Sequence, residues 1–136
     1  MAKMTERMME LFDKVPVVVL CTTNGANEPN AIPVGTKKII DPETILFSDQ
    51  FFNKTIENLK VNKQVAVTFW EGAEGYQLKG TVTIETTTER YRETAKWVEE
   101  LSAKIGFPMK SKGAVIVKID EIYGVSPGPG AGRKLA

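Results

Sequence analysis

The sequence predicts a mainly β protein of the α+β class, built as a six-stranded antiparallel barrel with peripheral helices. Six segments rich in β-branched residues are interspersed with three helical segments, and most of the strands are joined by short turns. Strands and helices do not alternate regularly, as they would in a doubly wound sheet. The 136 residues contain no internal repeat and no low-complexity linker, so we expect a single domain over residues 1–136.

The chain opens with a helical pattern of apolar residues. Met4, Met8, Leu11 and Phe12 lie three or four positions apart or side by side, which predicts an amphipathic N-terminal helix within residues 1–13. Charged residues interrupt this segment and no continuous apolar run is present. We therefore expect neither a signal peptide nor a membrane span here.

Two strands are predicted next. Residues 15–23 are dominated by β-branched side chains and read as a strand buried on both faces. A second strand is predicted at 29–40, but Pro29, Pro33 and Gly35 interrupt it. Because proline cannot donate to a β-ladder, this strand must lie at an edge of the sheet or carry a bulge.

The remaining elements follow in chain order. They are a third strand at 44–49, a short helix at 54–61, strands at 64–70 and 75–87, a longer helix at 88–106 and a last strand at 113–125. In the longer helix the apolar residues from Tyr91 to Ile105 recur at helical spacing, and Gly106 suits the left-handed position that ends a helix. The tail at 126–136 is rich in Pro and Gly and has no periodicity.

Composition excludes several kinds of function. The 18 Lys and Arg residues nearly balance the 17 Asp and Glu residues, so we expect no nucleic-acid partner and no membrane partner. With no histidine, the chain cannot build a Ser-His-Asp triad, a His-rich metal site or an axial histidine for haem. Cys21 is the single cysteine, which favours a reducing, cytoplasmic compartment. Any redox or group-transfer chemistry is therefore expected from a bound cofactor.

The start of the short helix indicates an anion site. Asn53, Lys54 and Thr55 follow a loop with two adjacent phenylalanines. The first turn of a helix has unpaired N–H groups and a positive dipole end, and both favour a phosphate. Lys54 adds a charge and Thr55 a hydroxyl donor. On this segment alone a second interpretation stays open, in which Asn53 only caps the helix and Lys54 is solvated.

Four motifs between Ile32 and Trp70 occur in a characteristic order: PVGTK at 33–37, FS at 47–48, NKT at 53–55 and VAVTFW at 65–70. In order and separation they resemble the FMN-binding split-barrel family, in particular the small single-domain members related to pyridoxamine 5'-phosphate oxidase. The strand YQLKGTVTI, the closing strand VIVKIDEIYGV and the tail extend the resemblance over nearly the whole chain.

The resemblance implies a homodimer with FMN at the subunit interface, together with a small-molecule electron donor or acceptor. Lys54 and Thr55 would hold the phosphate, and Asn53 stands where the family usually carries a basic residue. Ser48 and Asp49 would line the ribityl or phosphate end. Ile32, Pro33, Val34 and Lys37 would approach the isoalloxazine ring, and Gln77 would donate to a flavin carbonyl or serve only in packing. The expected cofactor-binding residues are Ile32, Pro33, Val34, Lys37, Ser48, Asp49, Asn53, Lys54, Thr55 and Gln77, with no catalytic side chain and no metal ligand.

The expected function is that of an FMN-binding flavoprotein, an oxidoreductase of unassigned substrate. A pyridoxamine phosphate oxidase also needs a cluster of basic residues, including a histidine, to hold a second phosphate, and this chain lacks that cluster. The alternative is a non-catalytic FMN carrier or electron-transfer module. A nucleic-acid-binding barrel is disfavoured by the near-zero net charge.

Overall fold

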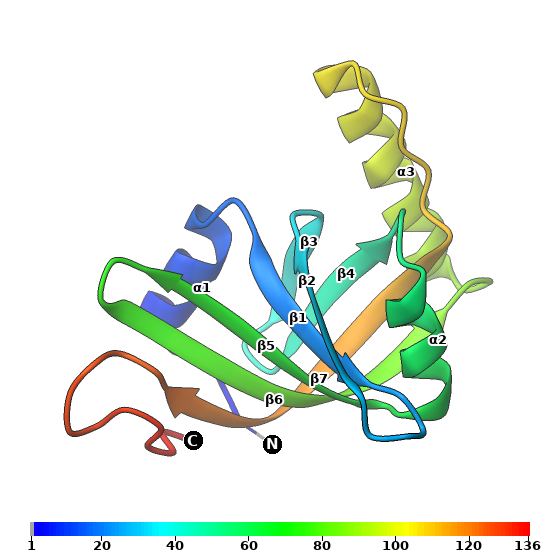
Figure 1. Cartoon of the computed structure of the whole chain (residues 1–136). Coiled ribbons are helices and arrows are strands. Elements are labelled where there is room, and N and C mark those ends of the chain that lie inside the picture. Colours follow the sequence, from blue (N-terminus) through cyan, green and yellow to red (C-terminus); the bar gives the residue numbers. More distant parts are fainter. Residues whose placement is uncertain (1) are drawn as a thin grey trace.

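One curled antiparallel sheet forms the body of the computed structural model, which describes residues 2–136 (Figure 1). The strands are β1 (Val18–Thr23), β2 (Pro29–Val34), β3 (Lys37–Asp41), β4 (Thr44–Asp49), β5 (Gln64–Glu71), β6 (Glu74–Glu85) and β7 (Gly113–Gly124), and the helices are α1 (Glu6–Lys14), α2 (Lys54–Val61) and α3 (Glu89–Ile105). The strand order is β2-β1-β5-β6-β7-β4-β3. The predicted mainly β split barrel with peripheral helices is confirmed.

The predicted number of six strands is wrong, because the described residues contain seven. The segment predicted as one strand at 29–40 is divided into β2 and β3, with Gly35 and Thr36 between them. These two strands are the opposite edges of the sheet. The edge position that the prolines predicted is confirmed, and the interruption at Gly35 is the point where the chain leaves one edge for the other.

This short step determines the shape of the sheet. Three Cα–Cα steps separate Val34 from Lys37, so the two edges lie at most about 11 Å apart at this corner. The backbone N–H of Ser48 in β4 donates to the carbonyl of Thr36, at 3.1 Å. The sheet therefore curls until its edges approach each other at one end, and the seam between them is spanned by the β2–β3 connection.

The concave side of the sheet holds the core. Phe12, Phe47 and Phe69 are fully buried, and the rings of Phe12 and Phe69 meet edge to face with centroids 5.4 Å apart. Helix α1 contributes Phe12 and Leu11 to this core and begins with a capping box between Thr5 and Met8. The predicted N-terminal helix is thus present, but it runs from Glu6 to Lys14.

The prediction of a first strand buried on both faces is wrong for this chain. Helix α1 ends at Lys14, and its C-cap Val15 is already extended. The strand itself begins at Val18, three residues later than predicted. Along β1, Val18 and Leu20 are buried, whereas Val19 and Cys21 point to the convex side and are partly exposed. The convex face of β1 is therefore only partly covered by the described residues.

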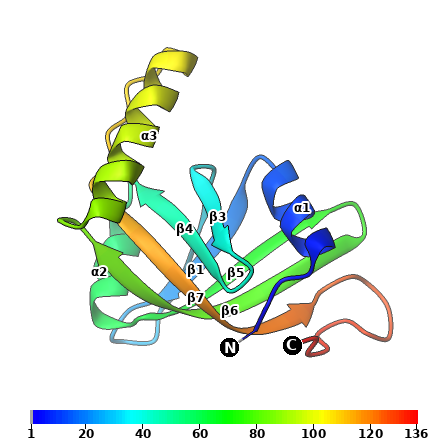
Figure 2. The same cartoon turned by 180° about the vertical axis from the view of Figure 1, so that it is seen from behind.

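Helix α3 projects away from the barrel (Figures 1 and 2). Its apolar spacing predicted an amphipathic helix, and the helix is present, but along it only Thr94 and Val98 are buried and Ile105 is 60% exposed. The part near Trp97 packs on Leu46, Ala114 and Ile116. The C-terminal half extends beyond the sheet and has no core to contact. Gly106 ends the helix with φ 70°, as predicted. No helix in residues 2–136 has the length and apolar character that crossing a membrane would require.

Both chain ends run along the same part of β7. Strand β4 pairs with β7 only over Gly113–Lys118, so the same edge of β7 is left without a strand partner beyond that point. The N–H of Ala2 donates to the carbonyl of Ile119. Further along, the N–H of Leu135 donates to Ile122, and the N–H of Ile122 donates to the carbonyl of Ala136, at 2.7 and 3.0 Å. The Pro/Gly-rich tail therefore turns back, and its last residues pair with β7.

Replacement of Gly80 by Ala is expected to destabilise the barrel. A β-bulge in the β6–β7 ladder lies at Lys79–Gly80, and a Cβ on Gly80 would meet Val117 Cγ1 at 2.5 Å and the Lys118 carbonyl oxygen at 2.7 Å. We expect Gly80→Ala to lower the free energy of unfolding by about 1–3 kcal/mol in urea titrations. Gly25→Ala, where no atom lies within 4 Å of the added carbon, is the matched control. Equal stability of the two variants would contradict the close contact at the bulge.

Candidate functional site

A cavity of about 330 Å³ opens at the seam between the two edges of the sheet. Three parts of the chain that are distant in sequence form its walls: the end of β2 with the β2–β3 connection, the end of β4 with the loop that follows it, and the connection from α3 to β7. The lining residues are Ile32, Pro33, Val34, Gly35, Thr36, Ser48, Gln50, Phe51, Phe52 and Met109. The curl of the sheet thus creates the cavity where β2 has no further strand partner.

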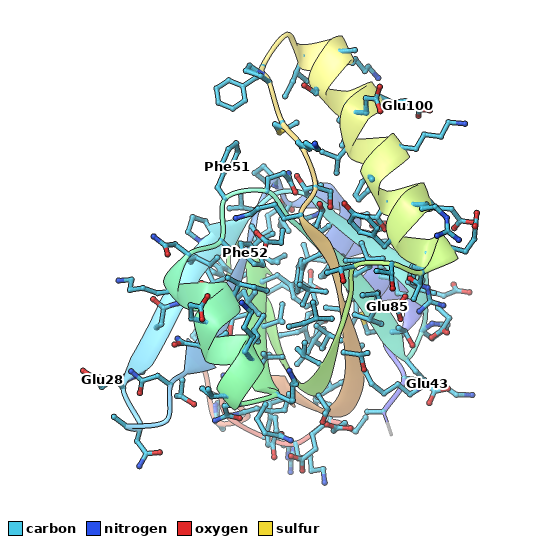
Figure 3. All side chains as sticks on the ribbon, turned by 90° about the vertical axis from the view of Figure 1, so that its right-hand side faces the viewer. Glu28, Glu43, Phe51, Phe52, Glu85 and Glu100 are labelled. Carbon is cyan, nitrogen blue, oxygen red and sulfur yellow. The ribbon has the colours of Figure 1, made fainter. Side chains whose placement is uncertain are left out.

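The two adjacent phenylalanines of the loop have different roles. Phe52 is 9% exposed and belongs to the core, whereas Phe51 is 68% exposed (Figure 3). The carboxylate of Asp49 accepts a hydrogen bond from the N–H of Phe52, at 3.0 Å, and this bond holds the turn. Lys112 lies 3.7 Å from the same carboxylate and donates to the carbonyl of Phe52. The loop thus directs one ring inward and leaves the other at the rim of the cavity.

A second cavity, of about 650 Å³, lies at the N-terminus of α2 and includes Asn30, Asn53 and Lys54 in its walls. Asn53 occupies the N-cap position, but its side chain makes no capping hydrogen bond. Of the second interpretation, the side-chain cap is therefore not found, whereas a solvated Lys54 agrees with the structure. Lys54 is exposed and forms no ion pair within residues 2–136. The positive end of the helix dipole and an ammonium group are consequently both available to an anion.

A buried polar network fixes α2 against the sheet. Asn30 Nδ2 in β2 donates to Thr55 Oγ1 at 3.0 Å and lies 3.3 Å from Thr22 Oγ1 in β1. Asn58 Nδ2 donates to the same Thr22 oxygen at 2.9 Å. Thr22, Thr55 and Asn58 are all buried. Since unsatisfied polar groups are costly to bury, these bonds define one position for α2 beside β2.

The two cavities follow each other along β2. Asn30 lines the cavity at α2, and Ile32, Pro33 and Val34 line the cavity at the seam. At the usual rise of a strand, residues 30–34 cover about 13 Å. We call these two cavities together the trough. β2 pairs with β1 on one side only, so the backbone groups of its other edge face the trough.

Six of the ten sequence-predicted site residues line the two cavities of this trough, and two more, Asp49 and Thr55, lie close by. Ile32, Pro33, Val34 and Ser48 line the seam cavity. Asn53 and Lys54 line the cavity at α2, and Asp49 shares a further cavity of about 400 Å³ with Asn53 on the other side of the loop. Thr55 lies below the helix, with its hydroxyl oxygen accepting the bond from Asn30.

Lys37 and Gln77 lie elsewhere. The Lys37 ammonium donates to the backbone carbonyl of Phe12 and lies 4.9 Å from the centroid of the Phe12 ring. Burial lowers the pKa of Lys37. It therefore closes the C-terminal end of α1 and does not line the trough. Gln77 points to the convex face, where it neighbours Thr68 and Tyr123, because the next residue, Leu78, points into the core.

Sequence reasoning missed several residues of the site. Gln50 Nε2 donates to Thr36 Oγ1 at 2.6 Å, and Gln50 Oε1 is buried with no hydrogen-bond partner within residues 2–136. Asn30 organises the network beneath α2. Met109 lies almost sixty residues from Gln50 in the chain, and no local pattern predicts that they meet.

A comparison with protein families finds a match over most of the chain. The family described as pyridoxamine 5'-phosphate oxidase matches residues 4–126. The uncharacterized protein MJ0282 of Methanocaldococcus jannaschii is 34% identical over 139 residues, in an alignment that covers 98% of this chain and 89% of that protein.

Solved structures show the same fold. HupZ from Group A Streptococcus has a TM-score of 0.80 at 22% sequence identity, covering 95% of this chain and 99% of that one. An FMN-binding protein from Syntrophomonas wolfei has a TM-score of 0.74 at 20% identity, covering 88% and 84% of the two chains. At these identities the two likenesses bear on the fold alone.

The carboxyl group of Asp49 is expected to make stability depend on pH. Burial raises the pKa of Asp49 above 3.8, although the Phe52 N–H and Lys112 oppose the shift. The folded state therefore binds this proton more tightly than the unfolded chain does, and the favourable contribution is lost as the pH rises through the raised pKa. The free energy of unfolding of the wild type, relative to that of Asp49→Asn, should fall as the pH is raised from about 4.

Urea titrations over a series of pH values measure this difference. Glu99→Gln, at an exposed position on α3, is the control. A difference between wild type and Asp49→Asn that stays constant or grows with pH would show that the carboxylate is not penalised by burial.

Proposed function

The chain belongs to the pyridoxamine 5'-phosphate oxidase family, and on that basis we propose that it binds FMN along β2 and works as a flavin-dependent oxidoreductase. The observation that carries the proposal is the uncapped N-terminus of α2, with Lys54 beside it, at one end of a trough whose other end is the seam cavity. The FMN-binding protein of Syntrophomonas wolfei, which shares the fold, supports the choice of cofactor.

The phosphate end of the cofactor fits the N-terminus of α2. A phosphate there accepts hydrogen bonds from first-turn N–H groups, and Lys54 adds a full charge. Thr55 holds the helix in place through Asn30, so its contribution to binding is through position as well as through its hydroxyl. Asn53, with its side chain free of capping bonds, is available as a donor to the same anion.

The ring end fits the seam cavity. The free edge of β2 offers backbone donors and acceptors, and Ile32, Val34 and Phe52 supply an apolar wall. The buried Gln50 Oε1 is an acceptor that lacks a donor among residues 2–136, and in this proposal an imide N–H of the ring supplies one. When bound, FMN supplies hydride or single-electron transfer. None of the lining side chains ionises near neutral pH, so none serves as an acid or base. Their role in this proposal is to orient the ring and to exclude water.

The proposal includes a homodimer. The convex face of β1, β2 and β5 carries small apolar side chains, among them Val19, Ala31 and Ala66, and Trp70 near its end is 54% exposed. A second copy packed on this face covers them and brings Gln77 to the partner's flavin. The compartment that we propose is the cytoplasm, in keeping with the single cysteine.

The electron donor and acceptor are small molecules in this proposal, and the substrate is not pyridoxamine phosphate. The chain has no histidine, and a basic cluster for a second phosphate is missing from its sequence. The alternative of an FMN carrier without turnover is favoured by one observation: no titratable side chain lines the seam cavity. Reduction of the bound flavin by NADH or NADPH under anaerobic conditions, followed by reoxidation with an added acceptor, separates an oxidoreductase from a carrier.

Purified protein titrated with FMN tests the cofactor. We expect quenching of flavin fluorescence and a shifted visible spectrum on binding. Lys54→Gln should weaken FMN about tenfold or more, because a hydrogen bond to a charged phosphate is worth about 1.5–3 kcal/mol. Riboflavin, which lacks the phosphate, should bind the variant and the wild type alike.

Lys60→Gln provides the matched control, since Lys60 lies on the same helix but in its last turn, paired with Glu57. A protein that binds no FMN would remove the proposal. Equal FMN affinities of the Lys54 and Lys60 variants would show that the phosphate does not bind at the start of α2.

A further inference from the structure

A separate groove of about 660 Å³ lies between the loop after β4 and residues 106–112, which connect α3 to β7. Its lining residues are Gln50, Phe51, Tyr91, Ser102, Pro108, Met109, Lys110, Ser111 and Lys112. Gln50, Phe51 and Met109 also line the seam cavity. These three side chains are thus a shared wall between the groove and the place assigned to the flavin ring.

The outer wall of the groove is pinned although it has no regular secondary structure. Ser102 Oγ in α3 donates to the carbonyl of Phe107 at 2.7 Å and accepts from the N–H of Met109 at 3.0 Å. The Tyr91 hydroxyl donates to the carbonyl of Ser111, at 3.0 Å. Ser111 in turn is bonded to Ser48 in β4, at 2.8 Å. The groove is therefore formed before any ligand arrives, which lowers the cost of binding.

Aromatic rings stand at the rim. Phe51 and Phe107 meet edge to face with centroids 6.3 Å apart, and they are 68% and 55% exposed. Figure 3 shows Phe51 pointing away from α2 toward the connection that leaves α3, with Phe52 on the opposite side of the loop. Exposed aromatic faces at the mouth of a preformed groove favour a planar aromatic ligand.

The charge at the groove is positive. Two lysines and no carboxylate line it. Lys112 is partly engaged, because it lies 3.7 Å from Asp49 and donates to the carbonyl of Phe52. Lys110 is exposed and forms no ion pair in the described part of the chain. An anionic group on the ligand could therefore pair with Lys110 without displacing a carboxylate of residues 2–136.

We propose that this groove binds a planar aromatic anion. Its volume lies in the range of small-molecule sites, its rim offers rings for stacking, and its charge complements an acidic substituent. When the proposed flavin site is filled, a ligand here lies one layer of side chains away from the ring, a position that suits a small molecule exchanging single electrons with the flavin. Only this last role rests on the proposed function; the binding site itself does not.

Calorimetric titration of the full chain with naphthalene-2-sulfonate tests the site, and 2-naphthalenemethanol serves as the neutral probe of similar shape. We expect the sulfonate to bind more tightly than the alcohol. Lys110→Gln should weaken the sulfonate about fivefold and leave the alcohol unchanged. Phe51→Ala should weaken both probes. Lys104→Gln, an exposed lysine of α3 that does not line the groove, is the matched control and should bind like the wild type.

The titration is carried out on the protein alone and on the protein loaded with FMN. Binding that depends on Lys110 in both forms supports the groove, and the same binding in a chain that takes up no FMN supports it while overturning the proposed function. Three results would each contradict the proposed binding site. They are equal sulfonate affinities of the Lys110 and Lys104 variants, failure of the sulfonate to bind, and displacement of FMN by the sulfonate.

Discussion

The two-residue step from β2 to β3 is the constraint on which the rest of the structure depends. Gly35 and Thr36 join the opposite edges of a seven-stranded sheet. A flat or gently twisted sheet of this order would separate its edges by six strand spacings, roughly 28 Å. The connection allows far less than that, so the sheet has to curl, and the core fills its concave side. At the seam a strand edge, a loop and side chains then surround a cavity.

The polar network beneath α2 converts this curl into a defined ligand geometry. The amide of Asn30 reaches Thr55 on the helix and Thr22 on the neighbouring strand, and Asn58 on the helix bonds the same Thr22, so polar bonds add to the apolar contacts of Leu59 and Ile56. Apolar contacts alone tolerate sliding and rotation. A directional network allows neither, and it places the positive end of the helix dipole at the end of β2 opposite to the seam. The short helix is thus a fixed part of the trough.

Sequence patterns predicted most of the fold because the information is local. Alternating β-branched runs, short turns and the glycine at 106 identify the elements, and the prolines at 29 and 33 mark an edge strand. The division of 29–40 into two strands was missed, since Gly35 also suits a bulge within one strand and only the closed topology distinguishes the two. The exposure of Ile105 was missed for a related reason: periodicity reveals an apolar face but not the length of the surface that it meets.

The candidate site divides in the same way. Lys54 and Thr55 carry their own signal, because a helix start, a cation and a hydroxyl lie together in the sequence. Gln50 and Met109 carry none, since their proximity arises from the return of the chain after α3. Lys37 shows a different situation: its sequence position matches a cofactor motif, and within the fold the nearby carbonyl and ring of Phe12 contact its ammonium. A motif specifies which residue is present, and the packing of distant elements decides where its side chain points.

The pairing of both chain ends with β7 has a practical consequence. The carbonyl of Ala136 accepts a bond from Ile122, and Leu135 packs on Gly124, so the last residues shield backbone groups that β4 is too short to reach. Trimming them would bare a strand edge able to recruit the same strand of another molecule, with oligomers or fibres as the outcome. Affinity handles are therefore better attached through a spacer, and a shortened chain would be judged first by whether it stays monodisperse.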